Sequence, residues 1–497
     1  MENTENGDSL AKYGLLILSI ALATFMASLD GTIVNIALPT ISAAFDISSS
    51  TVSWVSTAYL LVMAGCVLIF GKISDVIGFK KIFLSGFVIF TLGSFLCGFL
   101  PEIIDSFYVL VGSRIIQAVG GAMISAIGPA MITTFIPMSL KGKAMGIIMT
   151  IAALGTALGP TIGGFLTQYM SWHWIFFINV PIGIIAVVLG TKVIPATTAR
   201  GDLSGFDKSG AALIFVGLAS LLFAVSEGNA LGWTSPVIAG TFILAVASLG
   251  YFVWHELKSA DPILELSLFK NRNFLLTNLI LSLVFFSYSG INYLLPFYLE
   301  YVQGFDTSSA GLILTSLSFA MMFAGILAGA VFNKTGGKVL CIVAAFALAA
   351  GYFLMTKLGV DTTLGFVVLC LLTIGFGLGL MVTPISNMIM NSVSRNHQGM
   401  VSSLTSLERF APMTIGIALF NLVFIQGMTT IAAHRGVTLD APVNIRMSVL
   451  ASGFDLAFFV AFIFGIVILI LTFIVRQEIH PDFAHDAEKE EPVTGLI

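Results

Sequence analysis

The sequence predicts an all-α integral membrane protein with fourteen transmembrane helices, on the evidence of its composition and of the lengths of its apolar runs. Of the 497 residues, 57% are hydrophobic and only 10% are charged, whereas soluble proteins carry about 25% charged residues. A water-soluble fold cannot cover its surface with so little charge. Apolar runs of about 20 residues, the length that crosses a bilayer, recur along the chain. The formal net charge of -4 and the lack of any Lys/Arg run exclude nucleic-acid binding.

The apolar runs fall into a group of six, a shorter pair and a second group of six. They are residues 13–38, 51–70, 82–100, 107–135, 144–166 and 174–194, then 210–225 and 236–254, then 274–299, 310–332, 339–355, 364–390, 400–425 and 456–475. We therefore expect an N-terminal tail (1–12), a six-helix bundle (13–195), a linker with two additional transmembrane helices (196–270), a second six-helix bundle (271–476) and an acidic C-terminal tail (477–497).

The distribution of positive charge supports the count of spans and predicts their orientation. Lys and Arg collect in cytoplasmic loops. With fourteen spans, the loops on the side of the two termini hold nearly all the positive charges, and the loops on the other side hold only Lys357, Arg435 and Arg446. Adding or removing one span would put later positive loops on the wrong side. We therefore expect a multi-pass protein of the cell membrane with both termini in the cytoplasm.

Landmarks in the two groups of six runs repeat at a nearly fixed offset. Gly78 and Gly336 lie 258 positions apart (336 − 78 = 258), and Pro39 and Pro296 lie 257 apart (296 − 39 = 257). A half of the chain is shorter than this offset, and the pair of additional runs fills the difference. Two parallel halves around a site at the middle of the membrane are a common plan of transporters.

The sequence shows no pattern typical of a disulfide framework, a metal site or a cleaved signal peptide. The four cysteines, at positions 66, 97, 341 and 370, all lie in apolar runs without metal or redox spacing, so no disulfide framework is expected. The first apolar run is too long for the core of a signal peptide, and we expect it to remain as a membrane anchor. His480 and His485 lie in the acidic tail and suggest no metal site.

Residues 29–39, Leu-Asp-Gly-Thr-Ile-Val-Asn-Ile-Ala-Leu-Pro, resemble the first-span signature of a known family. The family is the fourteen-span drug/proton antiporters of the major facilitator superfamily, the multidrug exporters of the quaternary-ammonium-resistance type. Residues 71–81, 114–122, 155–164 and 172–181 are similar to further motifs of that family. The resemblance implies two six-helix bundles with two extra helices between them, and multidrug efflux, a route to antibiotic resistance, by alternating access.

The resemblance also implies which partners the protein uses. A small amphipathic or cationic compound is expected to leave in exchange for protons, so the proton gradient replaces any cofactor. The alternative is a proton-coupled transporter of a specific metabolite, such as an amino acid, a peptide or a siderophore-like solute. An enzyme or a non-transporting receptor is less well supported, because HExxH, GxSxG and phosphate-binding motifs are missing from the sequence. Nothing in the sequence indicates an accessory envelope protein.

Asp30 lies well inside the first apolar run, where an ionised carboxylate costs about 2.5 to 3.5 kcal/mol on insertion scales. It must therefore be paired, hydrated or protonated, which suits a site that loads and releases a proton. The alternative is a structural acid that is hydrogen-bonded between helices. Arg114 and Gln117 match the family's fourth-span motif, and Asp30 is the natural partner of a buried arginine. The resemblance implies that Arg114 assists proton transfer, and a purely structural ion pair is the alternative.

The segment from Gly71 to Lys81 joins the second and third runs and is similar to the hallmark loop of the superfamily. The resemblance implies that Asp75 acts as a conformational latch, while Gly71 and Gly78 permit a tight approach of two helices. Apolar residues, Val76 and Phe79, stand where the family pattern has basic residues, so any charge relay in this loop is expected to use Lys80 or a partner elsewhere. A merely positive cytoplasmic loop is the alternative.

Residues 155–164 match the antiporter motif that exporters of the superfamily carry. Gly155, Gly159 and Gly163 recur every four residues, so they share one helix face and permit close helix contact. Pro160 removes a backbone donor and is able to kink the helix, and Gly164 completes the motif. The resemblance favours outward export, and packing without any bearing on direction is the alternative.

The thirteenth run contains two adjacent charges, Glu408 and Arg409. Adjacent residues point about 100° apart on a helix, so they need not pair with each other. Together with Gln117, they are predicted to act in substrate binding or coupling. Glu408 either contacts a cationic substrate or neutralises a neighbour. Aromatic residues on the ninth run either line an apolar cavity with cation–π capacity or face lipid and core; they include Phe285, Phe286, Tyr288, Tyr293 and Phe297.

Overall fold

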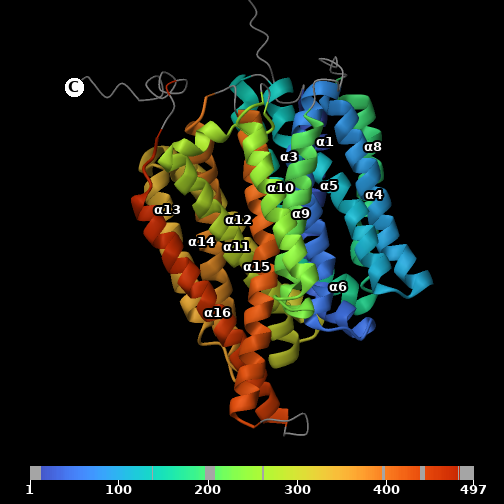
Figure 1. Ribbon diagram of the computed structural model, residues 1–497, viewed down its shortest axis with the longest axis vertical. Helices are drawn as coiled ribbons and strands as arrows, with labels where there is room; N and C mark the ends of the chain where they lie inside the picture. The colour runs from blue at the N-terminus through green and yellow to red at the C-terminus, as the bar shows by residue number, and fades with distance from the viewer. Residues whose placement is uncertain are drawn as a thin grey trace, which may run out of the picture.

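The computed structural model describes residues 13–136, 138–195, 207–259, 262–394, 398–436, 443–478 and 481, and within this part of the chain every regular element is a helix (Figure 1). Fourteen helices in these described ranges are long and apolar enough to cross a membrane. They correspond one to one with the fourteen apolar runs of the sequence. The prediction of an all-α membrane protein with fourteen spans is confirmed.

The first half of the chain forms eight helical segments. They are α1 (Gly14–Ala44), α2 (Ser49–Val52), α3 (Trp54–Ile77), α4 (Phe79–Ile104), α5 (Phe107–Phe135), α6 (Met138–Tyr169), α7 (Trp174–Phe177) and α8 (Asn179–Val193). The short α2 continues into α3, and α7 into α8, so these pairs each make one span. We call α1 to α8 the first half.

Two additional helices and a second half follow. They are α9 (Lys208–Leu231), α10 (Pro236–Glu256), η3 (Leu266–Lys270), α11 (Arg272–Phe297), η4 (Tyr298–Val302), α12 (Thr307–Thr335), α13 (Gly337–Met355), α14 (Leu364–Asn391), α15 (Gln398–His434) and α16 (Val443–Ile474). We call α11 to α16 the second half. In Figure 1, α1 begins and α16 ends at the same end of the bundle, which we call the terminal face.

Three helices continue beyond the apolar runs from which they were predicted, so those predicted bounds are too short. The run predicted at 51–70 continues to Ile77 in α3, and the run predicted at 456–475 begins at Val443 in α16. Helix α15 likewise extends to His434 rather than to residue 425. The extensions of α15 and α16 pack on each other: a Cβ at Gly453 would lie 3.2 Å from the Cβ of Met428. Helix contacts thus stabilise turns that hydropathy does not mark.

Glycines with positive φ make the tight links at equivalent positions of the two halves. Gly78 joins α3 to α4 with φ 95°, and Gly336 joins α12 to α13 with φ 76°. Side chains with a Cβ rarely adopt these angles, so glycine is required at both positions. The two glycines have the predicted offset, so the sequence repeat corresponds to a repeated turn.

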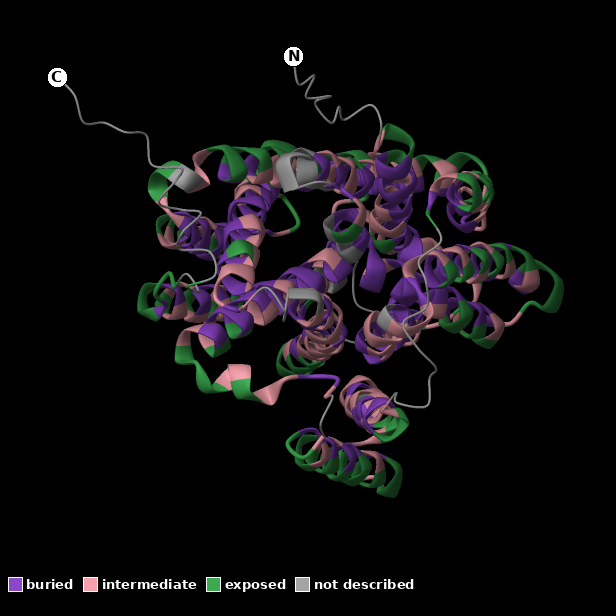
Figure 2. Cartoon of the chain, turned by 90° about the horizontal axis from the view of Figure 1, so that it is seen from above, coloured by how far each residue is buried: buried purple, intermediate pink, exposed green. Residues whose placement is uncertain are grey.

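Within each half, neighbouring helices pack in pairs. In the first half α1 packs on α6, and α5 packs on α3 and α4; in the second half α12 packs on α14, and α11 packs on α15. Two seams join the halves, one between α6 and α12 and one between α3 and α15. Figure 2 shows the helices from the terminal face, with buried residues concentrated on their inner sides.

The two additional helices lie outside these bundles. Helix α9 contacts both α3 and α15, and α10 packs mainly on α9 (Figures 1 and 2). At the far end, Trp54 of α3 donates a hydrogen bond to Glu227 of α9. Near the terminal face, the Nε2 of His255 lies 2.9 Å from the carboxylate of Asp207, and this polar contact joins the end of α10 to the start of α9. The pair of helices therefore covers the seam between α3 and α15.

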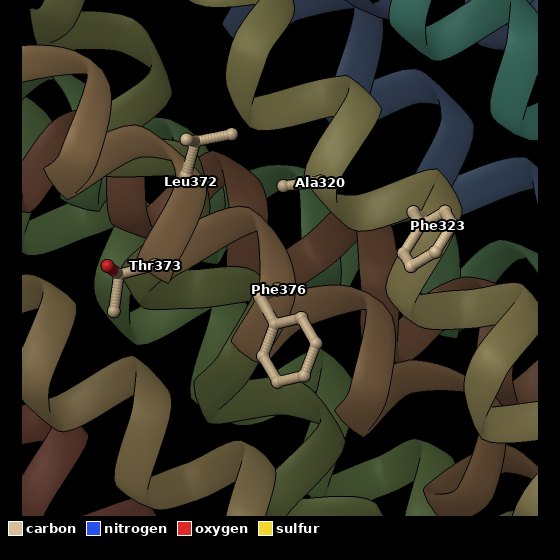
Figure 3. Close-up of a pocket in the computed structure, with 5 residues that line it drawn as sticks. All are labelled: Ala320, Phe323, Leu372, Thr373 and Phe376. Carbon is tan, nitrogen blue, oxygen red and sulfur yellow. The ribbon is translucent and has the colours of Figure 1, made fainter.

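The outer surface of the bundle is apolar, as a bilayer requires. Phe323 on α12 is 70% exposed, and with four neighbours it lines a shallow groove of about 520 Å³ between α12 and α14 (Figure 3). Thr373 contributes the hydroxyl of this groove, and that hydroxyl already donates to the carbonyl of Leu369 at 2.7 Å. The groove therefore offers an apolar surface to lipid and no polar group for a solute.

Candidate functional site

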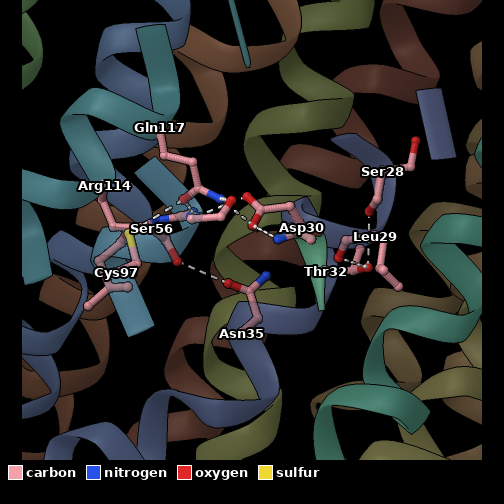
Figure 4. Close-up of polar contacts among 12 residues, drawn as sticks. Ser28, Leu29, Asp30, Thr32, Asn35, Ser56, Cys97, Arg114 and Gln117 are labelled. Carbon is pink, nitrogen blue, oxygen red and sulfur yellow. Dashed lines mark hydrogen bonds and ion pairs between the residues drawn. The ribbon is translucent and has the colours of Figure 1, made fainter. Parts of the chain in front are cut away.

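Asp30 lies at the centre of a buried polar cluster between α1, α5 and α8. Its carboxylate is fully buried and forms an ion pair of 2.9 Å with Arg114 of α5 (Figure 4). Gln117 donates to the other carboxylate oxygen at 2.9 Å, and Asn179 of α8 donates to that same oxygen at 3.1 Å. A buried ionised group needs partners of this kind to offset its lost hydration. The expectation that Asp30 pairs with Arg114 agrees with the geometry.

The guanidinium of Arg114 is buried and held on several sides. Its Nε donates to the backbone carbonyl of Val55 at 3.0 Å, and its Nη1 also donates to Gln117. The guanidinium carbon lies 4.1 Å from the centre of the Tyr59 ring and 5.6 Å from that of Phe176. These contacts fix the arginine at one position beside Asp30, which a flexible surface cation would not keep.

Three members of the cluster were not identified from the sequence. Asn179 lies in the stretch 172–181 that resembles a family motif, so its place in a motif was a signal for it. Ser94 of α4 accepts a hydrogen bond of 2.8 Å from Gln117, and Tyr59 of α3 lies under Arg114. Single serines and tyrosines inside apolar runs carry no pattern that separates site residues from packing residues.

The ion pair makes the charges of Asp30 and Arg114 depend on each other. A proton on the carboxylate removes its negative charge and leaves Arg114 without a counter-ion. An uncompensated buried charge of this kind costs about 3 to 5 kcal/mol. Protonation therefore favours any rearrangement that hydrates Arg114 or gives it another partner.

A second face of α1, beside Asp30, is open. Thr24, Ala27, Gly31 and Asn35 recur at helical spacing and are all partly or largely accessible. A Cβ added at Gly31 would meet no atom within 4 Å. Asn35 accepts a hydrogen bond of 3.1 Å from Ser56 of α3. The middle of α1 therefore presents a polar, accessible face in addition to the buried face that carries Asp30.

In the second half, Arg409 and Glu408 occupy the middle of α15 and differ in exposure. Arg409 is exposed, and its guanidinium carbon lies 5.4 Å from the ring centre of Phe285 on α11. Glu408 is only 9% exposed, and its Oε2 has no hydrogen-bond partner. Among the described residues no ion pair joins the two charges, and their separation of about 100° on a helix makes such a pair unnecessary. No hydrogen bond or ion pair within the described part of the chain joins either residue to Gln117, with which they were grouped in the prediction from the sequence.

The glycines of residues 155–164 bring α6 into direct contact with two helices. A Cβ at Gly155 would lie 2.7 Å from the backbone oxygen of Phe25, and a Cβ at Gly159 would overlap Thr32. Both contacts are on α1. The backbone oxygen of Pro160 lies against Gly311 of α12, in the second half. The motif therefore contacts the Asp30 helix on one side and the other half of the molecule on the other.

The remaining glycines of the motif extend these contacts. A Cβ at Gly163 would lie 2.6 Å from Ile36 of α1, and a Cβ at Gly164 would lie 2.6 Å from the backbone oxygen of Thr307 of α12. Nearby, the hydroxyls of Thr161 and Thr315 form a hydrogen bond of 2.6 Å between α6 and α12. This seam joins the halves near the end opposite the terminal face.

The predicted latch segment lies at the terminal face, and most of it is helical. A Cβ at Gly71 would lie 2.5 Å from Ser403 of α15, so this glycine lets the two halves meet closely. Lys80 donates to the backbone oxygen of Thr191 at 2.8 Å and joins α4 to α8. The side chain of Asp75 lies outside the described part of the structure. The latch role of this segment remains a prediction.

Among the residues that the structure describes, no group of three His, Cys, Asp or Glu side chains is placed to hold a metal ion. The free thiols are Cys66, Cys97, Cys341 and Cys370. Cys97 borders the cluster, since its thiol lies 3.7 Å from the Gln117 carbonyl oxygen. The cluster is thus built from an acid, its cation and neutral hydrogen-bonding groups.

Comparisons with known proteins agree with this geometry. Residues 20–417 match the model of the Major Facilitator Superfamily. The chain is 35% identical over 419 residues to the riboflavin transporter RibZ of Clostridioides difficile (strain 630). The aligned region covers 84% of this chain and 89% of that protein. It is 32% identical over 415 residues to the multidrug transporter protein MdtP of Bacillus subtilis (strain 168), covering 83% of this chain and 75% of that protein.

Solved structures support the fold. A D-xylose–proton symporter superposes with a TM-score of 0.62 at 13% identity, over 94% of this chain and 98% of that one. A bacterial homologue of the human lysosomal transporter Spinster, in an inward-facing and unoccupied conformation, superposes with a TM-score of 0.64 at 15% identity, over 94% and 97%. Family match, relatives and architecture agree: the chain belongs to the major facilitator superfamily and is a membrane transporter, and its fourteen membrane-length helices fit the fourteen-span subfamily.

Proposed function

We propose that the protein is a proton-coupled antiporter that exports small amphipathic compounds across the cell membrane by alternating access between its two halves. The observation that carries this proposal is the buried pair of Asp30 and Arg114, held by Gln117 and Asn179. An acid with a cation and neutral donors is suited to exchange a proton when its surroundings change. Both termini are proposed to lie in the cytoplasm, on the basis of the charge asymmetry of the loops.

The helix that carries Asp30 provides a route by which proton binding is coupled to the movement of the two halves. Asp30 lies on α1, and α1 packs against the glycine face of α6, which in turn contacts α12 of the second half. A rearrangement that gives Arg114 a new partner after protonation therefore acts on a helix that is one contact away from the seam between halves. Rocking of the halves about a central site is the general mode of such transporters.

The direction of transport is proposed from the glycine motif. Gly155, Gly159, Gly163 and Gly164 match the motif that exporters of the superfamily carry, and their close contacts to α1 and α12 agree with a role in the movement of the halves. The relative named as a multidrug transporter supports transport of more than one kind of compound.

The structure favours amphipathic over permanently cationic substrates. The acid of the first half is already paired with Arg114, and Glu408 is buried. The charge that is accessible in the middle of the second half is the cation Arg409. A fixed positive charge on the substrate would meet repulsion at this side chain.

The second candidate is proton-coupled transport of one specific metabolite. The relative named as a riboflavin transporter favours it, since it is 35% identical and similar in length to this chain. Both candidates share the fold and the Asp30 cluster, so transport assays must separate them.

The test uses purified protein in liposomes of defined orientation that contain a pH-sensitive dye. Adding an amphipathic fluorescent compound should cause proton movement opposite to the movement of the compound, and imposing a pH gradient should drive its accumulation. Proton movement in the same direction as the compound would mean that the protein is a cotransporter and not an antiporter. Transport that ignores the pH gradient would overturn the proposal.

A further inference from the structure

We propose that Arg409 and the aromatic side chains around it bind the substrate, and that the substrate is a planar aromatic molecule with hydrogen-bond acceptors or a negative charge at its edge. This inference deepens the proposed transport function and rests on it. Arg409 is exposed although its helix, α15, is long and apolar enough to cross the membrane.

The charge of Arg409 has no counter-ion among the described residues. The contacts of its guanidinium are with rings, Phe285 at 5.4 Å and Phe410 at 5.9 Å. A charged side chain in the middle of a transmembrane helix must be paired or must face an aqueous space. Because Arg409 is exposed and unpaired, it faces such a space and keeps its donors available.

Arg409 lies on the side of α15 that packs on α11. Gly416, two turns further along α15 and near the same face, packs on Phe286 and Ser289 of α11. The guanidinium carbon of Arg409 lies 5.4 Å from the ring centre of Phe285, also on α11. Helix α15 packs on α3 of the first half as well, so Arg409 lies on a helix that contacts both halves.

Tyr59 of α3 borders the Asp30 cluster, because its ring centre lies 4.1 Å from the guanidinium carbon of Arg114. Helix α3 also packs on α15, the helix that carries Arg409. A ligand at Arg409 would therefore lie on a helix in direct contact with one that borders the site proposed to carry the proton.

The open face of α1 offers a second surface for the proposed ligand. Gly31 is exposed, with no atom within 4 Å of an added Cβ, and Asn35 is partly accessible. Helix α1 contacts α11, which carries Phe285. A glycine at this point leaves room for a flat ring, and the Asn35 amide offers a neutral polar group.

The charges of this region select the chemistry of the ligand. Asp30 is already paired with Arg114, and Glu408, the neighbour of Arg409 in the sequence, is buried. The accessible charge is therefore that of Arg409, so a carboxylate or electron-rich carbonyl edge is attracted and an ammonium group is repelled. A guanidinium binds such edges in its own plane through two parallel donors, and rings stack on its face. A planar aromatic acceptor satisfies both requirements.

The experiment measures equilibrium binding to the purified full-length protein in lipid nanodiscs, without any pH gradient. Three fluorescent probes share one planar ring system and carry a carboxylate, a neutral amide or a quaternary ammonium group. We expect the carboxylate to bind at least tenfold more tightly than the ammonium probe, with the amide between them. Arg409→Gln should weaken the carboxylate probe at least tenfold and the ammonium probe by less than twofold.

Matched variants separate a binding role from a folding role. Lys357→Gln removes a positive charge that lies outside this region, beside Phe353, and should leave all three affinities unchanged. Arg409→Lys keeps the charge without the planar fork and should recover only part of the affinity. Thermal unfolding of each variant checks that the fold is kept.

The opposite pattern of results would overturn the inference. If the ammonium probe binds best and Glu408→Gln rather than Arg409→Gln removes binding, the substrate is a cation held by Glu408. If Arg409→Gln changes no affinity while proton-coupled transport persists, the inference fails and the proposed function stands. If the carboxylate probe binds through Arg409 but its transport ignores the pH gradient, the proposed function fails and the binding site stands.

Discussion

Asn179 at the start of α8 donates a hydrogen bond of 3.1 Å to Asp30 of α1, across 149 positions of sequence. Together with the ion pair to Arg114, this contact ties three separate spans to one carboxylate. The acid is therefore part of the packing of the first half as well as a proposed proton carrier. Changes in its charge act on several helices at once.

The replacement Asp30→Asn is expected to abolish proton-driven transport, with at least a hundredfold loss of the initial rate in proteoliposomes. Asparagine keeps the size of the side chain but carries no titratable proton. It also leaves Arg114 buried without its ion pair, which costs about 3 to 5 kcal/mol. Size-exclusion chromatography and thermal unfolding must show that the variant remains folded.

Asp30→Glu is the matched control for this prediction, since it restores the acid at slightly altered geometry. It should recover part of the transport rate. Gradient-driven accumulation that persists in Asp30→Asn would remove this residue from the coupling mechanism.

Asn179→Ala is expected to destabilise the first half by about 1 to 3 kcal/mol, because a buried carboxylate loses one of its donors. Thermal unfolding in detergent should show the effect as a lower midpoint. Asn179→Asp should be more damaging, because it places a second negative charge beside Asp30. An unchanged midpoint in both variants would mean that the hydrogen bond contributes nothing to stability.

Gly159→Ala is expected to destabilise the protein by about 1 to 3 kcal/mol and to reduce transport, because its new Cβ would overlap Thr32 and approach the backbone nitrogen of Ile33 at 3.2 Å. The control is Gly240→Ala on α10, where a Cβ would meet no atom within 4 Å. Unfolding midpoints and transport rates of the two variants are compared side by side. Equal behaviour would show that α6 does not need its close approach to α1.

Gly78→Ala is expected to lower stability by about 1 to 2 kcal/mol, because φ at this position is 95° and a Cβ strains that conformation. Gly329→Ala is the control, since it lies inside α12 with open space around it and alanine favours a helix. The yield of folded protein and the unfolding midpoint report the difference. Gly336→Ala should resemble Gly78→Ala, because the two glycines make the same link.

The pH dependence of substrate binding distinguishes antiport from cotransport by its sign. In an antiporter the proton and the substrate exclude each other, so substrate affinity should fall as the pH falls. In a cotransporter the affinity should rise over the same range. Fluorescence titrations of the carboxylate probe above between pH 5 and pH 8, repeated on Asp30→Asn, measure this sign, and the variant should lose the dependence.

Prediction from the sequence succeeded where a single residue or a local run carries the physical constraint. Asp30 and Arg114 are visible because ionised side chains are rare inside apolar runs, and pairing them follows from the cost of leaving either alone. The glycines of residues 155–164 are visible by their spacing. Ser94 and Tyr59 remained hidden, because a neutral polar group in an apolar run has the same appearance whether it binds a site residue or packs against a helix.

The sequence by itself determined the class of the molecule, its fourteen spans, the repeated Gly78 and Gly336 turns and the buried acid, because hydropathy, chain stiffness and the cost of buried charge are properties of local residues. The tertiary structure alone decided that Asn179 reaches Asp30, that α9 covers the seam between α3 and α15, and that Arg409 is exposed while Glu408 beside it is buried. These features depend on which helix faces pack together, and helix packing brings together residues that lie far apart in the sequence.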